Sequence, residues 1–143
     1  MSGAAYDIIV VGGGMVGAAT ALAAAQQGFR VALLERAAPA MEWAADSHDL
    51  RVSALTRASQ RILQNLGVWQ GMQAMRVTAY ERMQVWERKG QGEIHFAAAD
   101  LGEPDLGHIV ENRVVVAALW AALRQQRNVD ILLGLELTGL GEQ

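Results

Sequence analysis

The fold of this chain is decided by one stretch near its start, Tyr6-Asp7-Ile8-Ile9-Val10-Val11-Gly12-Gly13-Gly14-Met15-Val16-Gly17. It opens with a short β-branched run that is typical of a buried strand in a parallel sheet. Three glycines follow at the spacing Gly-x-Gly-x-x-Gly, and the alanine-rich segment after them predicts a helix to about Gln27 that stops at Gly28. A second apolar run, Val31 to Leu34, ends on Glu35. This order predicts a strand–helix–strand unit with a dinucleotide-binding turn.

Each glycine of the turn has its own physical role. Gly12 permits the tight turn after the strand, Gly14 leaves room for a pyrophosphate to approach the backbone, and Gly17 lets the helix pack close to the sheet. The helix N-terminus offers unpaired N–H groups and a positive dipole end to the phosphates. Glu35, 18 residues after Gly17, lies where a carboxylate accepts hydrogen bonds from the adenosine ribose. Its charge would repel a 2′-phosphate, which argues against NADP in this site.

Two other interpretations of this stretch are a glycine-rich loop in an ordinary α/β unit and a membrane-spanning segment. Residues 8–25 carry no charge over 18 residues, which is long enough to suggest a membrane span. Three adjacent glycines interrupt the run, and no Lys or Arg precedes it, so the positive region of a signal peptide is missing. We therefore expect a helix packed on a sheet.

Composition narrows the functional classes. The 143 residues are 52% hydrophobic with a net charge of −3, which suits a globular domain with one modest core and gives no basic surface for nucleic acid. The absence of cysteine excludes a disulfide framework, a thiol nucleophile and a thiolate metal site; because nothing in the sequence suggests secretion, we expect a reducing cytoplasm. The three histidines have no partner at metal-ligand spacing, so we expect no metal site. Because one strand–helix–strand unit needs further strands, we expect the N-terminal part of a longer protein.

The middle of the chain predicts a loop, a helix and a hairpin. Residues 37–49 predict a loop, and residues 49–55 are expected to lead into a helix at 59–66 that buries Ile62, Leu63 and Leu66 and ends at Gly67. Residues 68–75 are expected to continue on the same core. The alternation in 80–87, the turn at 89–92 and the short run at 93–96 predict a β-hairpin, which we assign, within 79–97, to the start of a substrate layer.

The last third of the chain predicts a strand, a helix and another strand. Residues 108–110 are expected to be extended, and Asn112 is expected to cap a helix reaching Gln126. Residues 129–133 predict a further buried strand. Trp69, Trp86 and Trp120 are interpreted as residues that pack in the core or at an interface. The buried stripe of the helix is expected to hold Val115, Val116, Leu119, Trp120 and Leu123.

Four motifs in this chain occur together in one known family. They are Gly12-Gly13-Gly14-Met15-Val16-Gly17-Ala18-Ala19, Asp49-Leu50-Arg51-Val52-Ser53-Ala54, Leu66-Gly67-Val68-Trp69 and Gly107-His108-Ile109-Val110-Glu111-Asn112. The combination resembles the ubiquinone-biosynthesis hydroxylases, a branch of the class A flavoprotein monooxygenases that includes para-hydroxybenzoate hydroxylase. The resemblance covers nearly the whole chain, but only about the first third of such an enzyme. It implies an α/β, Rossmann-like FAD-binding domain of three layers around a parallel sheet, followed by the start of a β-rich substrate layer.

The resemblance also implies a non-covalently bound FAD and the residues that hold it. The turn would face the pyrophosphate and Glu35 the adenosine ribose, with Arg36 beside the adenosine. Arg51 stands in the family's Arg-x-x-Ala motif near the cofactor, and Arg113 lies where the family has a polar side chain that reaches the pyrophosphate. Surface solvation or a helix-end ion pair is the simpler alternative for the three arginines. The residues of the turn are Gly12, Gly13, Gly14, Met15, Val16 and Gly17.

The implied activity is hydroxylation of a polyprenyl benzoquinol or phenol ring with NAD(P)H and O2, through a C4a-hydroperoxide of the flavin. No residue of this chain need act as acid or base, because the cofactor carries the chemistry. The long apolar substrate is compatible with a cytoplasmic enzyme that works at the inner membrane surface, and with a ubiquinone-biosynthesis complex. A simple NAD-dependent dehydrogenase and a non-enzymatic binding or escort protein of the same fold are the alternatives.

Overall fold

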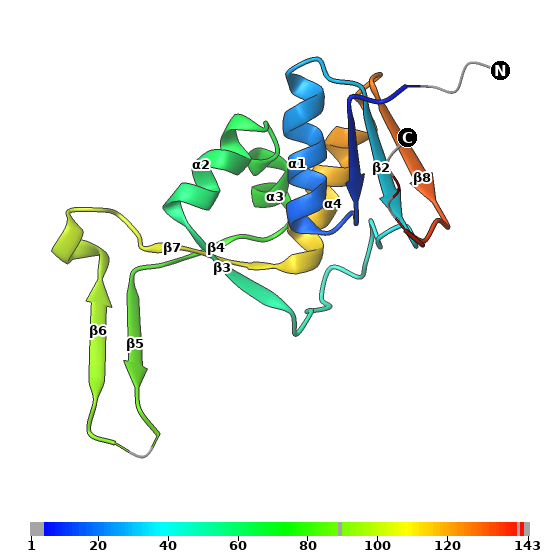
Figure 1. Ribbon diagram of the computed structural model, residues 1–143. Coiled ribbons are helices and arrows are strands. Elements are labelled where there is room, and N and C mark those ends of the chain that lie inside the picture. The colour runs from blue at the N-terminus through cyan, green and yellow to red at the C-terminus, as the bar shows by residue number, and fades with distance from the viewer. Residues whose placement is uncertain (1–4, 89, 140, 142–143) are drawn as a thin grey trace.

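The computed structural model describes residues 5–88, 90–139 and 141 and shows a parallel sheet, an antiparallel sheet and a projecting hairpin (Figure 1). The expected strand–helix–strand unit is present with its predicted order and nearly its predicted bounds. Along the chain, the elements are β1 (Ile8–Val11), α1 (Met15–Gln26), β2 (Val31–Glu35), β3 (Val52–Thr56), α2 (Arg57–Asn65), α3 (Trp69–Met75), β4 (Thr78–Tyr80), β5 (Arg82–Trp86), β6 (Glu93–Ala97), a short 3-10 helix (Ala98–Leu101), β7 (Gly107–Glu111), α4 (Asn112–Leu123) and β8 (Val129–Leu133).

The parallel sheet has the strand order β1-β2-β8, so the strand predicted at 129–133 joins the sheet beside β2. Helix α1 packs on one face of this sheet through fully buried small side chains such as Ala18 and Ala21. The close approach depends on Gly17, because a Cβ atom there would overlap the carbonyl oxygen of Gly12. On the opposite face, Ile9 and Val11 of β1 are exposed. The α/β fold with a parallel sheet is thus confirmed.

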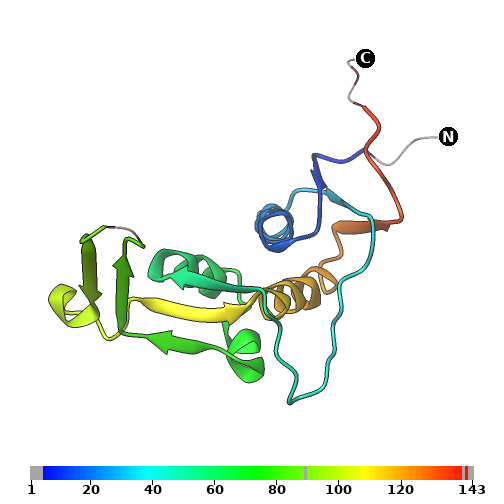
Figure 2. The same ribbon diagram turned by 90° about the horizontal axis from the view of Figure 1, so that it is seen from below.

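The antiparallel sheet has the order β3-β7-β4, and α4 lies between it and the parallel sheet (Figure 2). Residues 52–56 were expected only to lead into a helix, but they form β3 because every one of them pairs with a residue of β7. The helix that follows begins at Arg57 and is capped by the Thr56 side chain, which accepts from the N–H of Ser59. The buried stripe predicted there is partly wrong, since Ile62 is 57% exposed.

Helix α4 begins where predicted but is not capped as predicted. Its N-cap is Glu111, and the Asn112 side chain instead accepts a hydrogen bond from the Ser53 hydroxyl on β3. The helix ends at Leu123, before the predicted Gln126, because the N–H of Gln126 bonds to the carbonyl of Leu123 in a tighter turn. Leu119, Trp120 and Leu123 are buried in the core as expected.

The hairpin β5–β6 projects away from both sheets (Figure 1). Met83 pairs with Phe96 and Val85 with Ile94, so these four side chains share one face, and all four are exposed. Lys89 of the predicted turn lies outside the described residues. In the described part of the chain, no helix has the length and apolar character that crossing a membrane requires.

Candidate functional site

The glycine turn lies at the end of the parallel sheet where β1 and β2 terminate and where α1 and α4 begin (Figure 1). Gly12 adopts a φ of 97°, a conformation that favours glycine, and its N–H donates to the Leu34 carbonyl at 2.8 Å. The turn is thereby tied to the neighbouring strand. It directs the chain straight into the first turn of α1.

The start of α1 has the features of a phosphate site. A Cβ atom built at Gly14 meets no other atom within 4 Å, so the space above this residue is open. Within the described residues, no side chain caps the helix and none in its first turn is acidic. Val16 is exposed beside this opening, while Met15 packs against the core. An anion can therefore reach the free N–H groups of this helix end, and the residues present fit the pyrophosphate of a dinucleotide.

Gly13, predicted as a cofactor residue, is held from both sides by the protein itself. Its N–H donates to Glu35 Oε2 at 2.6 Å, and its carbonyl accepts from Trp120 Nε1 at 2.7 Å. The Trp120 ring also occupies the space that a side chain at this position would need. Sequence reasoning interpreted Trp120 only as core packing, because a contact across 107 residues leaves no local signal.

Glu35 stands at the carboxyl end of β2, beside the turn, as predicted. Its Oε2 accepts from Gly13, and its Oε1 accepts from the N–H groups of Arg36 and Ala37. The N–H of Gly13 contributes most, and that of Ala37 next, to holding the pKa of Glu35 below its ordinary value. The side chain is therefore an ionised acceptor with a fixed orientation. Arg36 follows it at an exposed position.

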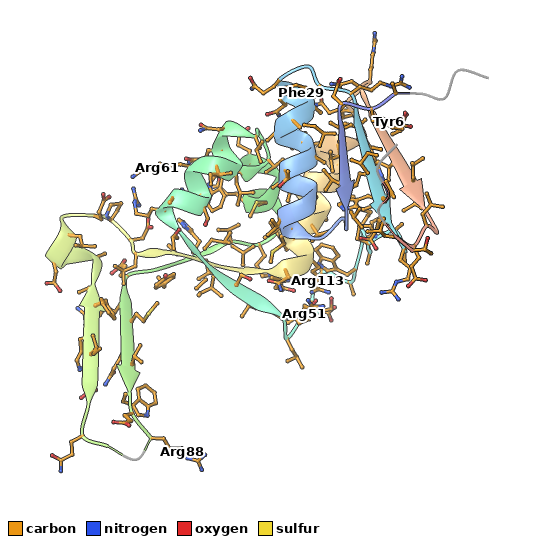
Figure 3. All side chains as sticks on the ribbon, in the orientation of Figure 1. Tyr6, Phe29, Arg51, Arg61, Arg88 and Arg113 are labelled. Atoms are coloured by element: carbon orange, nitrogen blue, oxygen red, sulfur yellow. The ribbon has the colours of Figure 1, made fainter. Side chains whose placement is uncertain are left out.

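Arg51 and Arg113 lie near each other where β3 meets the start of α4 (Figure 3). The carbonyl of Arg51 accepts from the N–H of Asn112, its own N–H donates to Asp49, and the residue is exposed. Arg113 donates to Glu111 Oε2, to the Ser47 hydroxyl and to the Ser47 carbonyl. Its guanidinium also lies 4.5 Å from the centre of the Trp43 ring.

Glu111 belongs to this group of side chains, although the sequence showed it only as part of the motif Gly107 to Asn112 and not as a candidate site residue. It is only 6% exposed and is bound by Arg76, Arg113 and the N–H of Asp49. The N–H of Asp49 contributes most to holding the pKa of Glu111 below its ordinary value, and Arg113 adds to the effect. The motif Glu111-Asn112 was visible, but its partners are far apart in the sequence.

The structure thus brings the predicted residues together in two groups. The turn residues 12–17 and Glu35 are joined directly, with Arg36 adjacent. Arg51 and Arg113 form the second group, together with Glu111. Helix α4 links the groups, because it carries Arg113 at its start and Trp120 against Gly13.

Comparison with known proteins shows what this chain is similar to. Residues 7–52 match the family described as FAD dependent oxidoreductase. The chain is 46% identical over 125 residues to the 3-demethoxyubiquinol 3-hydroxylase of Escherichia coli (strain K12), a match that covers 87% of this chain and 32% of that protein. It is 37% identical over 121 residues to the mitochondrial ubiquinone biosynthesis monooxygenase COQ6 of Xenopus tropicalis, covering 81% of this chain and 26% of that one.

Solved structures show the same fold. The crystal structure of p-nitrophenol 4-monooxygenase PnpA from Pseudomonas putida DLL-E4 superposes with a TM-score of 0.68 at 21% identity, over 95% of this chain and 33% of that one. The chain spans about a quarter to a third of the length of the curated relatives it matches. With the glycine turn and the sheet in place, the chain is thus similar in sequence to ubiquinone-biosynthesis hydroxylases, and residues 7–52 match the FAD dependent oxidoreductase family.

Proposed function

We propose that this chain supplies the dinucleotide-binding part of a non-covalent FAD site. The observation that carries the proposal is the open, uncapped start of α1 at Gly14, next to the oriented carboxylate of Glu35. N–H groups of the helix start would bind the pyrophosphate, and Glu35 would accept hydrogen bonds from the adenosine ribose. The family match over residues 7–52 supports FAD as the dinucleotide.

Three arginines would complete the proposed FAD site. Arg36 follows Glu35 directly and would lie beside the adenosine, while Arg51 and Arg113 would approach the cofactor from the junction of β3 and α4. Both Arg51 and Arg113 carry positive charge to that junction, as a pyrophosphate requires. Gly13, Met15 and Val16 shape the turn around it. Their contribution would be positioning, since Gly13 has both backbone polar groups bonded within the protein.

The proposed activity of the whole protein is hydroxylation of a polyprenyl-substituted quinol or phenol in ubiquinone biosynthesis, with NAD(P)H as reductant and O2 as oxygen donor. When bound, FAD supplies the redox and oxygen chemistry; the residues of this chain bind and orient it. The ring hydroxylated would be either a benzoquinol late in the pathway or a phenol earlier in it, and the 46% identity to the 3-demethoxyubiquinol 3-hydroxylase favours the late benzoquinol step. The exposed apolar face of the hairpin β5–β6 would belong to the substrate layer. Because the polyprenyl substrate is apolar, the whole protein would work at a membrane surface.

Two measurements test this proposal. The full-length protein should purify yellow and release FAD on denaturation; a colourless protein that binds only NAD would indicate a dehydrogenase instead. Deletion of the gene, followed by lipid extraction, should show accumulation of a demethoxy quinone precursor for the late step or of a polyprenyl phenol for the early one. Unchanged ubiquinone, with no second hydroxylase to replace the activity, would contradict the proposed reaction and leave the FAD site standing.

A further inference from the structure

A buried carboxylate between two arginines fastens the loop that leads to Arg51. We call residues 45–51 the anchored segment; they run from the long loop after β2 to the start of β3. Glu111 Oε1 accepts from Arg76 at 2.7 Å, and Oε2 accepts from Arg113 at 2.7 Å and from the N–H of Asp49 at 2.8 Å. The Asp49 contact is thus one direct bond from Glu111 to the segment.

Both arginines continue from Glu111 to the backbone of the same segment. Arg76 donates to the carbonyls of Ala45, at 2.7 Å, and of Ser47, at 3.1 Å. Arg113 donates to the Ser47 carbonyl at 2.7 Å and to its hydroxyl at 3.1 Å. Two guanidinium groups therefore meet at one carbonyl oxygen, and the Glu111 carboxylate is the charge that offsets their mutual repulsion.

The anchored segment ends on a residue of the proposed cofactor site. The N–H of Arg51 is bonded to Asp49, whose own N–H is bonded to Glu111, and the carbonyl of Arg51 is bonded to the N–H of Asn112. Arg113, the other cofactor candidate, is bonded to Glu111 directly. A change at Glu111 is therefore transmitted to both arginines through at most two hydrogen bonds.

We propose that Glu111 is a positioning residue for the cofactor, which fixes the anchored segment and sets the placement of Arg51 and Arg113 before the dinucleotide binds. This inference rests on the proposed FAD site, because it takes those arginines as cofactor contacts. Fixing the anchored segment before the dinucleotide binds matters, because the entropy cost of ordering a loop during binding weakens the affinity for the ligand. Glu111 itself is buried and acts through its partners.

Glu111→Gln tests the proposal in the full-length protein. A glutamine keeps the shape but has one acceptor oxygen, so its amide NH2 must face the donor of Arg76 or those of Arg113 and Asp49. We expect faster amide hydrogen exchange in residues 45–51 of the FAD-free protein, with α1 and β1 unchanged, and an FAD dissociation constant raised about tenfold. Glu42→Gln makes the same chemical change at an exposed position of the preceding loop and should leave both quantities unchanged.

Arg76→Gln is the second variant. It removes the charge bound to Glu111 Oε1 and the bonds to the carbonyls of Ala45 and Ser47, but it leaves the bonds of Arg113 in place, so it should give smaller shifts in the same direction. If Glu111→Gln accelerates exchange throughout the protein, the exchange rates of residues 45–51 in Arg76→Gln test the anchoring role instead. Local acceleration with wild-type FAD affinity overturns the cofactor role, and unchanged exchange at 45–51 in both variants overturns the anchoring role. A wild-type protein that binds no FAD overturns the proposed function, and the exchange data then still decide whether Glu111 anchors the segment.

Discussion

At the scale of single residues, Gly14 and Gly17 of the turn are needed for different reasons. Gly17 is required by the protein itself, since a Cβ there would overlap the Gly12 carbonyl. Gly14 has open space around it and a φ of −69°, which any residue adopts. A side chain at position 14 therefore interferes only with a ligand, whereas one at position 17 interferes with the packing of α1 on the sheet.

This difference predicts opposite results for two substitutions. Gly14→Val should keep the wild-type free energy of unfolding and lose bound flavin, because its branched side chain enters the pyrophosphate path. Gly17→Ala should lower the free energy of unfolding by about 1–3 kcal/mol, the usual cost of overpacking. Urea denaturation and the ratio of flavin to protein absorbance measure the two effects. Full flavin occupancy in the Gly14→Val protein would falsify the assignment of the phosphate site.

Trp120→Phe isolates the hydrogen bond that holds the turn from α4. The phenyl ring keeps most of the packing, but the Gly13 carbonyl loses the indole N–H at 2.7 Å. A buried acceptor without its donor costs about 1–3 kcal/mol, so the free energy of unfolding should fall by this amount. Trp86→Phe on the exposed hairpin is the matched control and should have no effect. Equal stability of the two variants in urea would show that the turn does not depend on Trp120.

At the scale of elements, helix α4 and the hairpin β5–β6 differ in their relation to the candidate site. Helix α4 contacts α1, α3 and β7 and carries residues of both site groups. The hairpin β5–β6 contacts the rest of the chain through its base and presents Met83, Val85, Ile94 and Phe96 to solvent. Such an apolar face indicates a surface that is covered in the whole protein.

The hairpin face gives a prediction that compares two lengths of the protein. Replacing Ile94 and Phe96 together by serine removes apolar surface that is exposed in residues 1–143, so the unfolding of that piece should change little. In the full-length protein, where we expect the face to pack in the substrate layer, the same double substitution should lower stability by about 2 kcal/mol or more. Urea titrations of both lengths provide the measurement. Equal, small changes in the two would mean that the face stays exposed.

The junction of the anchored segment with β7 should respond to acid. The pKa of Glu111 is lowered in the folded protein, so its contribution is fully present above the unfolded pKa of about 4.3 and is lost as pH falls through the folded value. Glu35, with its pKa lowered by Gly13 and Ala37, acts in the same direction. The wild-type protein should therefore lose more stability between about pH 5 and 3 than Glu111→Gln. Parallel pH profiles of unfolding would contradict the assigned charge of Glu111.

At the scale of the whole molecule, the chain holds one side of the proposed cofactor site and spans about a quarter to a third of the length of its curated relatives. Residues 1–143 alone should therefore bind adenine nucleotides weakly and turn over no substrate. Titration with ADP and an assay of NAD(P)H oxidation in the presence of a quinol analogue provide the two measurements. Quinol-stimulated oxidation by residues 1–143 alone would contradict the proposed division of the site.

Local pattern in the sequence determined the strand–helix–strand unit, its glycine turn and the place of Glu35. Each depends on residues close in the chain, such as the β-branched run before Gly12 and the helix that Gly28 ends. The hairpin was predictable for the same reason, because its strands are joined by a short turn. These local signals, with the family motifs, were sufficient for the fold class and for the predicted turn.

Tertiary structure alone decided the features that depend on distant partners. Residues 52–56 became a strand because β7, more than 50 residues later, pairs with them. Trp120 has a role in the turn because its indole N–H donates to the Gly13 carbonyl. Glu111 has a role in the anchored segment because Arg76, Arg113 and the N–H of Asp49 donate to its carboxylate. A hydrogen bond or ion pair across such separations leaves no periodicity in the sequence. It forms only when the packing of the helices and sheets has brought its donor and acceptor together.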